Sequence, residues 1–141
     1  MSTRLDGLDE IEIPGVDVQP GVRTTVFVTV GDRPFQPVMI EIDHDVAPHF
    51  LLSGFRVGGS EQFAPPIAAQ PVPAAIFARG NVGRLTCEVC KPGGALELDV
   101  FNQTGDVQRF AVTFAGRRPT PRQVVTDDNV RELLERVRRK N

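Results

Sequence analysis

The chain has 141 residues, of which 40% are hydrophobic and 24% charged, so it can bury one core of ordinary composition and needs no second domain. It contains nine Phe but no Tyr or Trp, and because stacking sites for sugars or single-stranded nucleic acid usually present exposed Tyr and Trp, these functions are disfavoured. The formal net charge is −2, and since residues 117–141 hold eight basic and four acidic side chains (+4), the rest of the chain carries −6.

The chain shows no signal for export or for a membrane. Its N-terminus lacks the apolar region of a signal peptide, and no later run approaches the roughly 18 apolar residues that a membrane span needs. Two cysteines are too few for a disulfide framework. We therefore expect a protein made in the cytoplasm, without a signal peptide or a membrane partner.

The first half of the chain predicts short strands between turns. Residues 1–21 are acidic and rich in proline and glycine, and we expect an N-terminal arm in which residues 10–13 can form a short strand. Residues 22–30 alternate clearly and predict a strand with Val26 on one face and Phe27 on the other.

The next segments are also read as strands. Val38, Ile40 and Ile42 share one face of a predicted strand. Residues 49–57 are apolar on both faces, so we expect a strand covered on both sides, with Gly54 able to mark a bulge that switches the faces.

A long loop is expected next. Residues 64–75 contain four prolines and predict a long ordered loop, followed by a short strand at Ile76 and Phe77.

Residues 84–115 look like the organising part of the domain. They predict strands at 84–89, 95–102 and 107–115, and the last two alternate strictly around turns rich in glycine. We interpret them as an antiparallel meander with one solvent-exposed face. The whole pattern predicts an all-β protein, with one eight-stranded antiparallel β-sandwich, a jelly roll, over residues 22–116.

The end of the chain changes character. Residues 117–125 are basic and contain two prolines, which predicts a stiff linker. Residues 126–141 predict a C-terminal α-helix with an apolar stripe at helical spacing. The stripe, which gives the candidate partner-binding residues, consists of Val130, Leu133, Leu134 and Val137. It can pack either on the sandwich of its own chain or on a neighbouring subunit.

One set of residues could hold a metal ion. Cys87 and Cys90, together with His44 and His49, offer a Cys2His2 ligand set for zinc. In an extended segment, however, the two sulfur atoms would point to opposite faces, about 10 Å apart along the chain. We therefore expect Cys87 to be a small core residue and Cys90 a partly exposed thiol, and we keep the metal site as the alternative.

The sequence holds no recognised local signature of catalysis. A nucleophile elbow and a P-loop are both absent, so we expect neither an enzyme nor a bound cofactor. The basic tail could contact phosphates or acidic protein surfaces equally well, which makes nucleic acid an expected partner only through this tail. A binding module for a small ligand is a third reading that the sequence leaves open.

A family resemblance adds to this reading. It is carried by Pro34-Phe35, by Phe50-Leu51-Leu52-Ser53-Gly54-Phe55-Arg56-Val57-Gly58, by Pro71-Val72-Pro73-Ala74, by Pro92-Gly93-Gly94 and by Val100-Phe101-Asn102-Gln103-Thr104-Gly105. In this order of strands and turns the chain resembles small β-sandwich proteins of bacteriophage virions, over roughly residues 34–116. The cysteine pair, the histidines and the tail helix depart from that pattern.

The resemblance implies a single jelly roll that contributes to a capsid. We therefore expect a non-enzymatic structural subunit of a phage-type particle, assembled in the host cytoplasm and present in the virion. Its expected partners are copies of itself, in a homo-oligomer, or other particle subunits.

Overall fold

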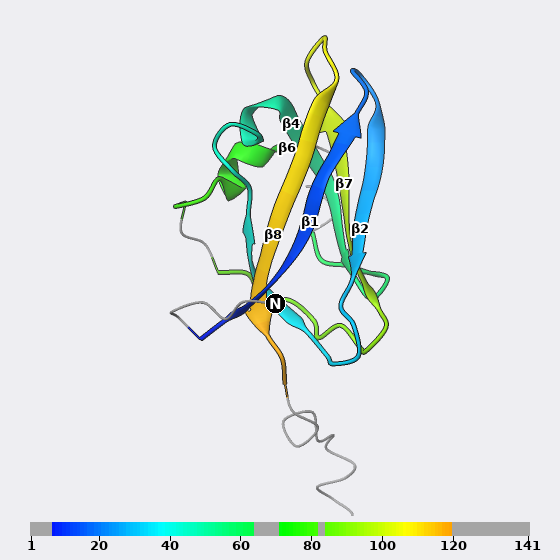
Figure 1. Ribbon diagram of the computed structural model, residues 1–141, viewed down its shortest axis with the longest axis vertical. Coiled ribbons are helices and arrows are strands. Elements are labelled where there is room, and N and C mark those ends of the chain that lie inside the picture. The colour runs from blue at the N-terminus through cyan, green and yellow to red at the C-terminus, as the bar shows by residue number, and fades with distance from the viewer. Residues whose placement is uncertain (1–6, 64–70, 82–83, 120–141) are drawn as a thin grey trace, which may run out of the picture.

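The structure, a computed structural model, describes residues 7–63, 71–81 and 84–119. These residues form two antiparallel sheets packed face to face (Figure 1), so the predicted all-β sandwich is confirmed. The strands are β1 (Asp9–Val18), β2 (Arg23–Thr29), β3 (Gln36–Glu41), β4 (Phe50–Val57), β5 (Ser60–Glu61), β6 (Val72–Pro73), β7 (Ala95–Asn102) and β8 (Gln108–Arg117). Two single turns of 3-10 helix, η1 (Ala47–His49) and η2 (Ala74–Phe77), complete the regular elements of this part of the chain. The helix predicted over residues 126–141 lies outside the described residues.

The first four strands alternate between the two sheets, and β4 to β7 then belong to the same sheet. One sheet has the order β1-β8-β3, and the other has the order β2-β7-β4-β5, with β6 also pairing with β4. Strands far apart in sequence are therefore neighbours, as β1 pairs with β8 and β2 pairs with β7. The pairs are nested, since the first strand meets the last and the second meets the next to last.

The meander predicted for residues 95–115 is wrong. Strand β7 lies between β2 and β4, whereas β8 lies between β1 and β3, so the two face each other across the core and do not pair. The turn between them crosses from one sheet to the other and is held by the buried side chain of Asn102. Its amide nitrogen donates to the carbonyl oxygens of Val18 (2.9 Å) and Asp106 (2.8 Å), and its oxygen accepts from the backbone N–H of Thr104 (2.9 Å).

Strand β1 is longer than the strand predicted at residues 10–13. It pairs with β8 from Asp9, opposite Gly116, to Val18, opposite Gln108, and the register shifts between Ile13 and Val16. An edge strand tolerates a proline and a bulge because one side of its backbone needs no partner. The described part of residues 1–21 thus belongs to the sandwich, whereas an arm was expected.

The bulge predicted in β4 is confirmed. The register with β7 shifts between Leu52 and Gly54, so Phe50 and Leu52 before the shift and Phe55 after it are all buried in one core. The bulge explains why apolar residues occupy both alternating positions. On the outer side of β4 Leu51 and Arg56 are half-buried, so the predicted covering of the second side is partial.

Two predicted strands are not found. Residues 84–89 have no regular strand and run beside β3, where the N–H of Leu85 donates to the carbonyl oxygen of Val38 at 2.7 Å. Ile76 and Phe77 lie in η2. Short apolar runs do not distinguish a strand from a single helical turn or from an irregular segment that packs on the core.

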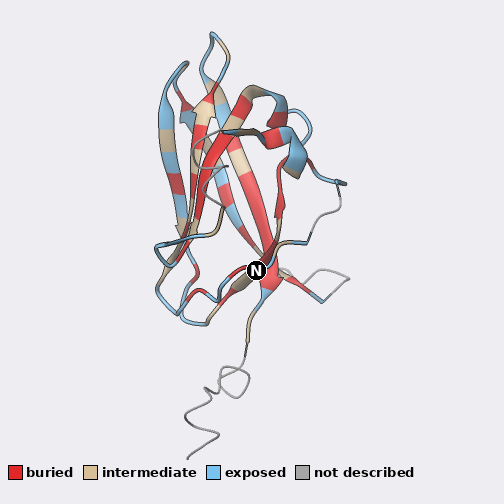
Figure 2. Cartoon of the chain, turned by 180° about the vertical axis from the view of Figure 1, so that it is seen from behind, coloured by how far each residue is buried: buried red, intermediate tan, exposed pale blue. Residues whose placement is uncertain are grey.

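The core lies between the two sheets, as the buried residues in Figure 2 show. Its largest fully buried side chains are phenylalanines, and two ring pairs join β4 of one sheet to β8 of the other. Phe50 meets Phe110 edge-on at 4.9 Å between ring centroids, and Phe55 stacks on Phe114 at 5.6 Å. These cross-sheet contacts hold the sheets together.

Candidate functional site

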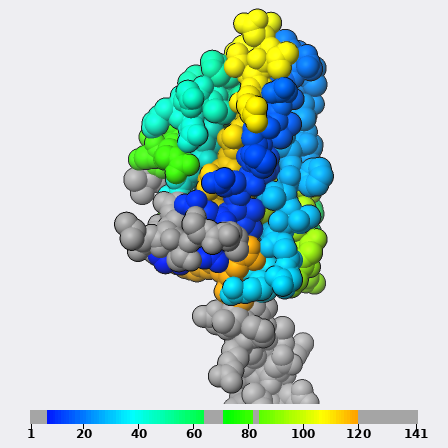
Figure 3. All heavy atoms as spheres, in the orientation of Figure 1, coloured from blue at the N-terminus to red at the C-terminus, as the bar shows by residue number. Residues whose placement is uncertain are grey.

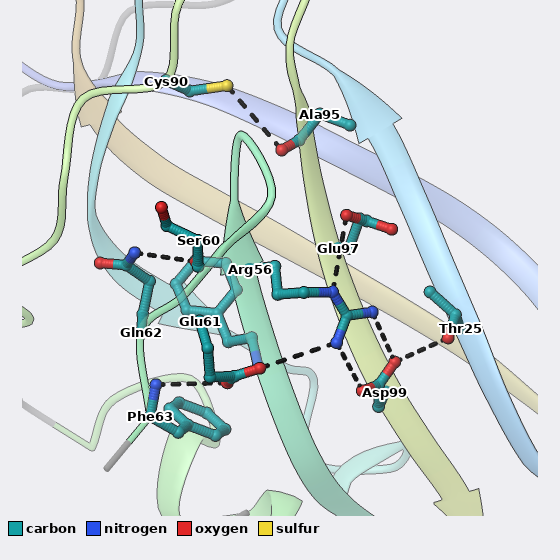
Figure 4. A network of polar contacts seen from close by, with 11 residues as sticks. Thr25, Arg56, Ser60, Glu61, Gln62, Phe63, Cys90, Ala95, Glu97 and Asp99 are labelled. Carbon is teal, nitrogen blue, oxygen red and sulfur yellow. Dashed lines mark hydrogen bonds and ion pairs between the residues drawn. The ribbon is translucent and has the colours of Figure 1, made fainter. Parts of the chain in front are cut away.

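The outer face of the five-stranded sheet carries a cluster of ionised side chains (Figure 4). Arg56 of β4 binds Asp99 of β7 through two hydrogen bonds, Nη1 to Oδ2 at 2.8 Å and Nη2 to Oδ1 at 2.9 Å. Glu97 of β7 and Glu61 of β5 flank the same guanidinium, each at 3.6 Å. One cation is thus surrounded by three carboxylates from two neighbouring strands.

Strand register explains why this cluster forms. Arg56 lies directly opposite Glu97 on one side and Glu61 on the other, and Gly54 lies opposite Asp99. Gly54 leaves room for the ion pair, because a Cβ atom at that position would lie 2.6 Å from Oδ2 of Asp99. The bulge before Gly54 is what directs Arg56 outward, since it shifts the parity of the strand.

The electrostatics of the cluster favour the ionised forms. The hydrogen bond from Arg56 is the main reason that the pKa of Asp99 lies below its ordinary value, and the hydroxyl of Thr25 also donates to Asp99 at 2.6 Å. The same pair raises the pKa of Arg56, chiefly through Asp99. Both groups therefore stay ionised at neutral pH and do not exchange protons there. The hydrogen bonds and ion pairs of the cluster link the side chains of β2, β7, β4 and β5.

We expect Arg56→Gln to raise the pKa of Asp99 toward its ordinary value and to lower the free energy of unfolding by about 1 kcal/mol near pH 7, since the cluster is partly exposed. Asp99 has a lowered pKa in the folded state, so its contribution is present above the unfolded value of about 3.9 and is lost as the pH falls through the folded value. The stability difference between the two proteins should therefore shrink below about pH 4. Urea unfolding at several pH values and carboxyl NMR titration measure both effects.

Arg33→Gln is the matched control, because it removes the same charge from an exposed position. An Arg33→Gln effect equal to that of Arg56→Gln would show that net charge, and not the ion pair, stabilises the fold.

The four candidate metal ligands are not brought together. His44 is exposed and His49 half-buried at the connection between β3 and β4, whereas Cys87 and Cys90 are buried beside β3. In the part of the chain that the structure describes, which includes all four, no three His, Cys, Asp or Glu residues gather in a way that could hold a metal ion. The Cys2His2 alternative is therefore not supported.

Cys90 differs from its predicted state, because it is fully buried and not partly exposed. Its S–H lies within 3.6 Å of the carbonyl oxygen of Lys91 and 3.8 Å of that of Ala95. The prediction assumed a regular strand at 84–89, and without that strand the alternation of faces does not apply. The expected burial of Cys87 agrees with the structure.

We expect both thiols to react slowly with a thiol reagent in the native protein. Burial raises the pKa of Cys87 to about 11 and also raises that of Cys90. At pH 8 the reaction of Cys87 should be at least about 100-fold slower than in guanidinium chloride, because the thiolate is the reacting species, and that of Cys90 should also be slower. Fast modification of either thiol in native buffer would contradict this burial.

Other candidate surfaces were only partly visible in the sequence. The stripe residues Val130, Leu133, Leu134 and Val137 lie outside the described residues. Phe27 of β2, predicted to lie on the face opposite to Val26, has 65% of its surface exposed, whereas Val26 is buried. Beside the end of β2, an open hollow of about 400 Å³ is lined in part by Glu12, Thr29 and Arg118.

Comparison with known proteins gives no match to a family model, to a curated protein or to a solved structure. Within the described ranges, no helix is long and apolar enough to cross a membrane. The function is therefore inferred from the fold and from the surfaces of this chain.

Proposed function

We propose that the protein is a non-enzymatic assembly subunit of a phage-type particle, which contacts copies of itself or other particle subunits. The observation that carries the proposal is the nested strand order, in which β1 pairs with β8, β2 with β7, and β4 with β5. Such nested pairs support a jelly roll, an architecture that viral capsid domains use. The irregular segment 84–90 runs beside β3 and takes the position of the remaining strand.

The described charged side chains support a structural role. Arg56 binds three carboxylates of the same sheet, and Arg79 binds Glu41 at 3.0 Å. A fold shared by many functions does not identify an activity, and these ion pairs offer no nucleophile with an adjacent base. We therefore assign the charged residues to stability and to contacts between subunits.

The path of the chain supports contacts through the tail. Asp9 and Gly116 are paired, so the chain enters and leaves the sandwich at the same end. Residues 117–141 carry +4 and the remainder −6, so a tail is attracted to the body of another subunit. Burial of the apolar stripe at roughly 25 cal/mol per Å² would supply most of the binding energy, and the charges would add orientation and salt dependence.

Deletion of residues 120–141 tests this role of the tail. We expect the truncated protein to keep a folded sandwich and to form less stable oligomers than the full chain, because the apolar stripe is removed. Circular dichroism follows the fold, and light scattering after size-exclusion chromatography follows the assembly.

Two results would contradict the proposed role. Truncated protein that assembles like the full chain would show that the tail is not needed. Truncated protein that unfolds as a monomer would show that the tail covers the core of its own chain.

A further inference from the structure

Three of the sheet edges in the described part of the chain are protected against pairing with another strand. Strand β1 has Pro14 and a shift of register, and β3 has Pro37 and a shift of register. Beside β3, Cys90 donates its N–H to the carbonyl oxygen of Phe35 at 2.7 Å, which covers part of that edge. At the third edge, β5 and β6 have only two residues each. Proline, bulges, covering segments and short length are the usual protections of an edge.

Strand β2 has none of these protections. Its seven residues pair with β7 without a shift of register, from Arg23 opposite Phe101 to Thr29 opposite Ala95. It contains no proline, and Arg23 is its only charged residue. It lies along one margin of the molecule, next to β1 (Figure 3). A straight edge of this kind is suited to accept another strand.

The backbone groups that face outward from β2 can be identified. The N–H of Val30 donates to the carbonyl oxygen of Gly94, and the N–H of Asn102 donates to that of Val22. Even-numbered residues of β2 therefore bond to β7, and in an antiparallel ladder the alternate residues point their N–H and C=O groups to the other side. These outward-pointing residues are Arg23, Thr25, Phe27 and Thr29, and all four are exposed.

We propose that β2 pairs antiparallel with β2 of a second copy of this chain, so that the two five-stranded sheets join into one. The inference rests on the proposed function in that it takes another subunit as the partner. The register that pairs all seven residues is centred on Val26. It places Arg23 opposite Thr29 of the second copy and Thr25 opposite Phe27, and it pairs residues whose backbone groups are both directed outward.

The side chains are complementary in this register. Each Phe27 meets a threonine, and aromatic pairs with β-branched residues stabilise neighbouring strands. The two arginines lie at opposite ends of the ladder and do not repel each other. Arg23 of the second copy lies beside Thr29, which lines the same hollow as Glu10, Glu12 and Arg118. The two-fold symmetry makes each of these contacts occur twice.

The test compares two lysine substitutions in the full chain. Phe27→Lys places a charge on the edge, next to Glu97 of the same sheet, so the separate subunit should remain folded. In the dimer the new lysine lies diagonal to Arg23 and to the substituted position 27 of the second copy, so like charges repel across the contact. We therefore expect the dimer dissociation constant to rise at least about tenfold. Val107→Lys, at an exposed apolar residue in the turn before β8, should leave the constant unchanged.

Sedimentation velocity over a range of concentrations measures association, and thermal unfolding confirms that both variants fold. Unchanged association of Phe27→Lys, or equal loss in Val107→Lys, would overturn the β2 contact. If the oligomer then still depends on residues 120–141, the proposed assembly function stands without it. A full chain that is monomeric at all concentrations would overturn both proposals.

Cysteine crosslinking tests the register and remains informative if Phe27→Lys fails to fold. An equal mixture of Thr25→Cys and Phe27→Cys proteins should form disulfide-linked dimers on mild oxidation, because these positions lie directly opposite each other at about 5.5 Å between Cα atoms. Either variant alone should crosslink much less, since the identical positions are about 7–8 Å apart on the diagonal. Equal crosslinking in the mixture and in the separate variants would overturn the register, and a mixture without crosslinks would overturn the pairing of β2.

Discussion

Gly116→Ala is expected to lower the free energy of unfolding by about 3 kcal/mol or more. Gly116 lies in β8, which is bonded on both sides, to β1 and to β3. A Cβ atom at this position would lie 2.6 Å from Cζ of Phe35 and would also overlap the backbone carbonyl of Gln36. Because the carbonyl belongs to a paired strand, it can move away only if β3 separates from β8.

Guanidinium unfolding of three alanine variants measures this effect. Gly105→Ala is the control, since nothing lies within 4 Å of its added Cβ, and its stability should change by less than about 1 kcal/mol. Gly54→Ala should fall between the two, because its added methyl group meets a side-chain oxygen of Asp99 that can move. A Gly116→Ala protein as stable as Gly105→Ala would contradict the close approach of β8 and β3.

Phe114→Ala should lower the free energy of unfolding by about 3–5 kcal/mol, because it removes a fully buried ring and leaves a cavity between the sheets. The ring stacks on Phe55 of the opposite sheet, so part of the loss comes from the contact that joins β8 to β4. Phe27→Ala is the control and should cost less than about 0.5 kcal/mol in the monomer, since this ring is exposed.

A double-mutant cycle separates the ring contact from the general loss of burial. The coupling energy between Phe55→Ala and Phe114→Ala should be about 0.5–1.5 kcal/mol. Strictly additive effects would show that the two rings do not support each other. Equal effects of Phe27→Ala and Phe114→Ala would contradict the assignment of Phe114 to the core.

The sequence determined the elements that have a long and regular pattern. Residues 95–102 alternate strictly, and β7 has these bounds in the structure. In this alternation Glu97 and Asp99 share the face opposite to the buried Leu98, and there they form part of the Arg56 cluster. This was possible because the direction of a side chain in a strand depends on the local backbone alone, with a period of two.

The sequence predicted less of the candidate sites. The cluster needs Arg56 to lie opposite Glu97 and Gly54 to leave room for Asp99, and both depend on pairing between strands more than 40 positions apart. The open edge of β2 is likewise a property of the whole sheet, because a strand is an edge strand only when the sheet places a neighbour on one of its sides and none on the other. No local pattern carries this information.

Only the tertiary structure decided which strands are neighbours. β7 and β8 follow each other in sequence and yet belong to different sheets, because the turn held by Asn102 crosses the sandwich. The segment at residues 84–89 is irregular, Cys90 after it is buried, and both cysteines lie apart from His44 and His49. Sequence patterns specify which face of a segment is apolar, but the partner of that face is chosen by the packing of the whole chain, where long-range pairing and burial outweigh local preference.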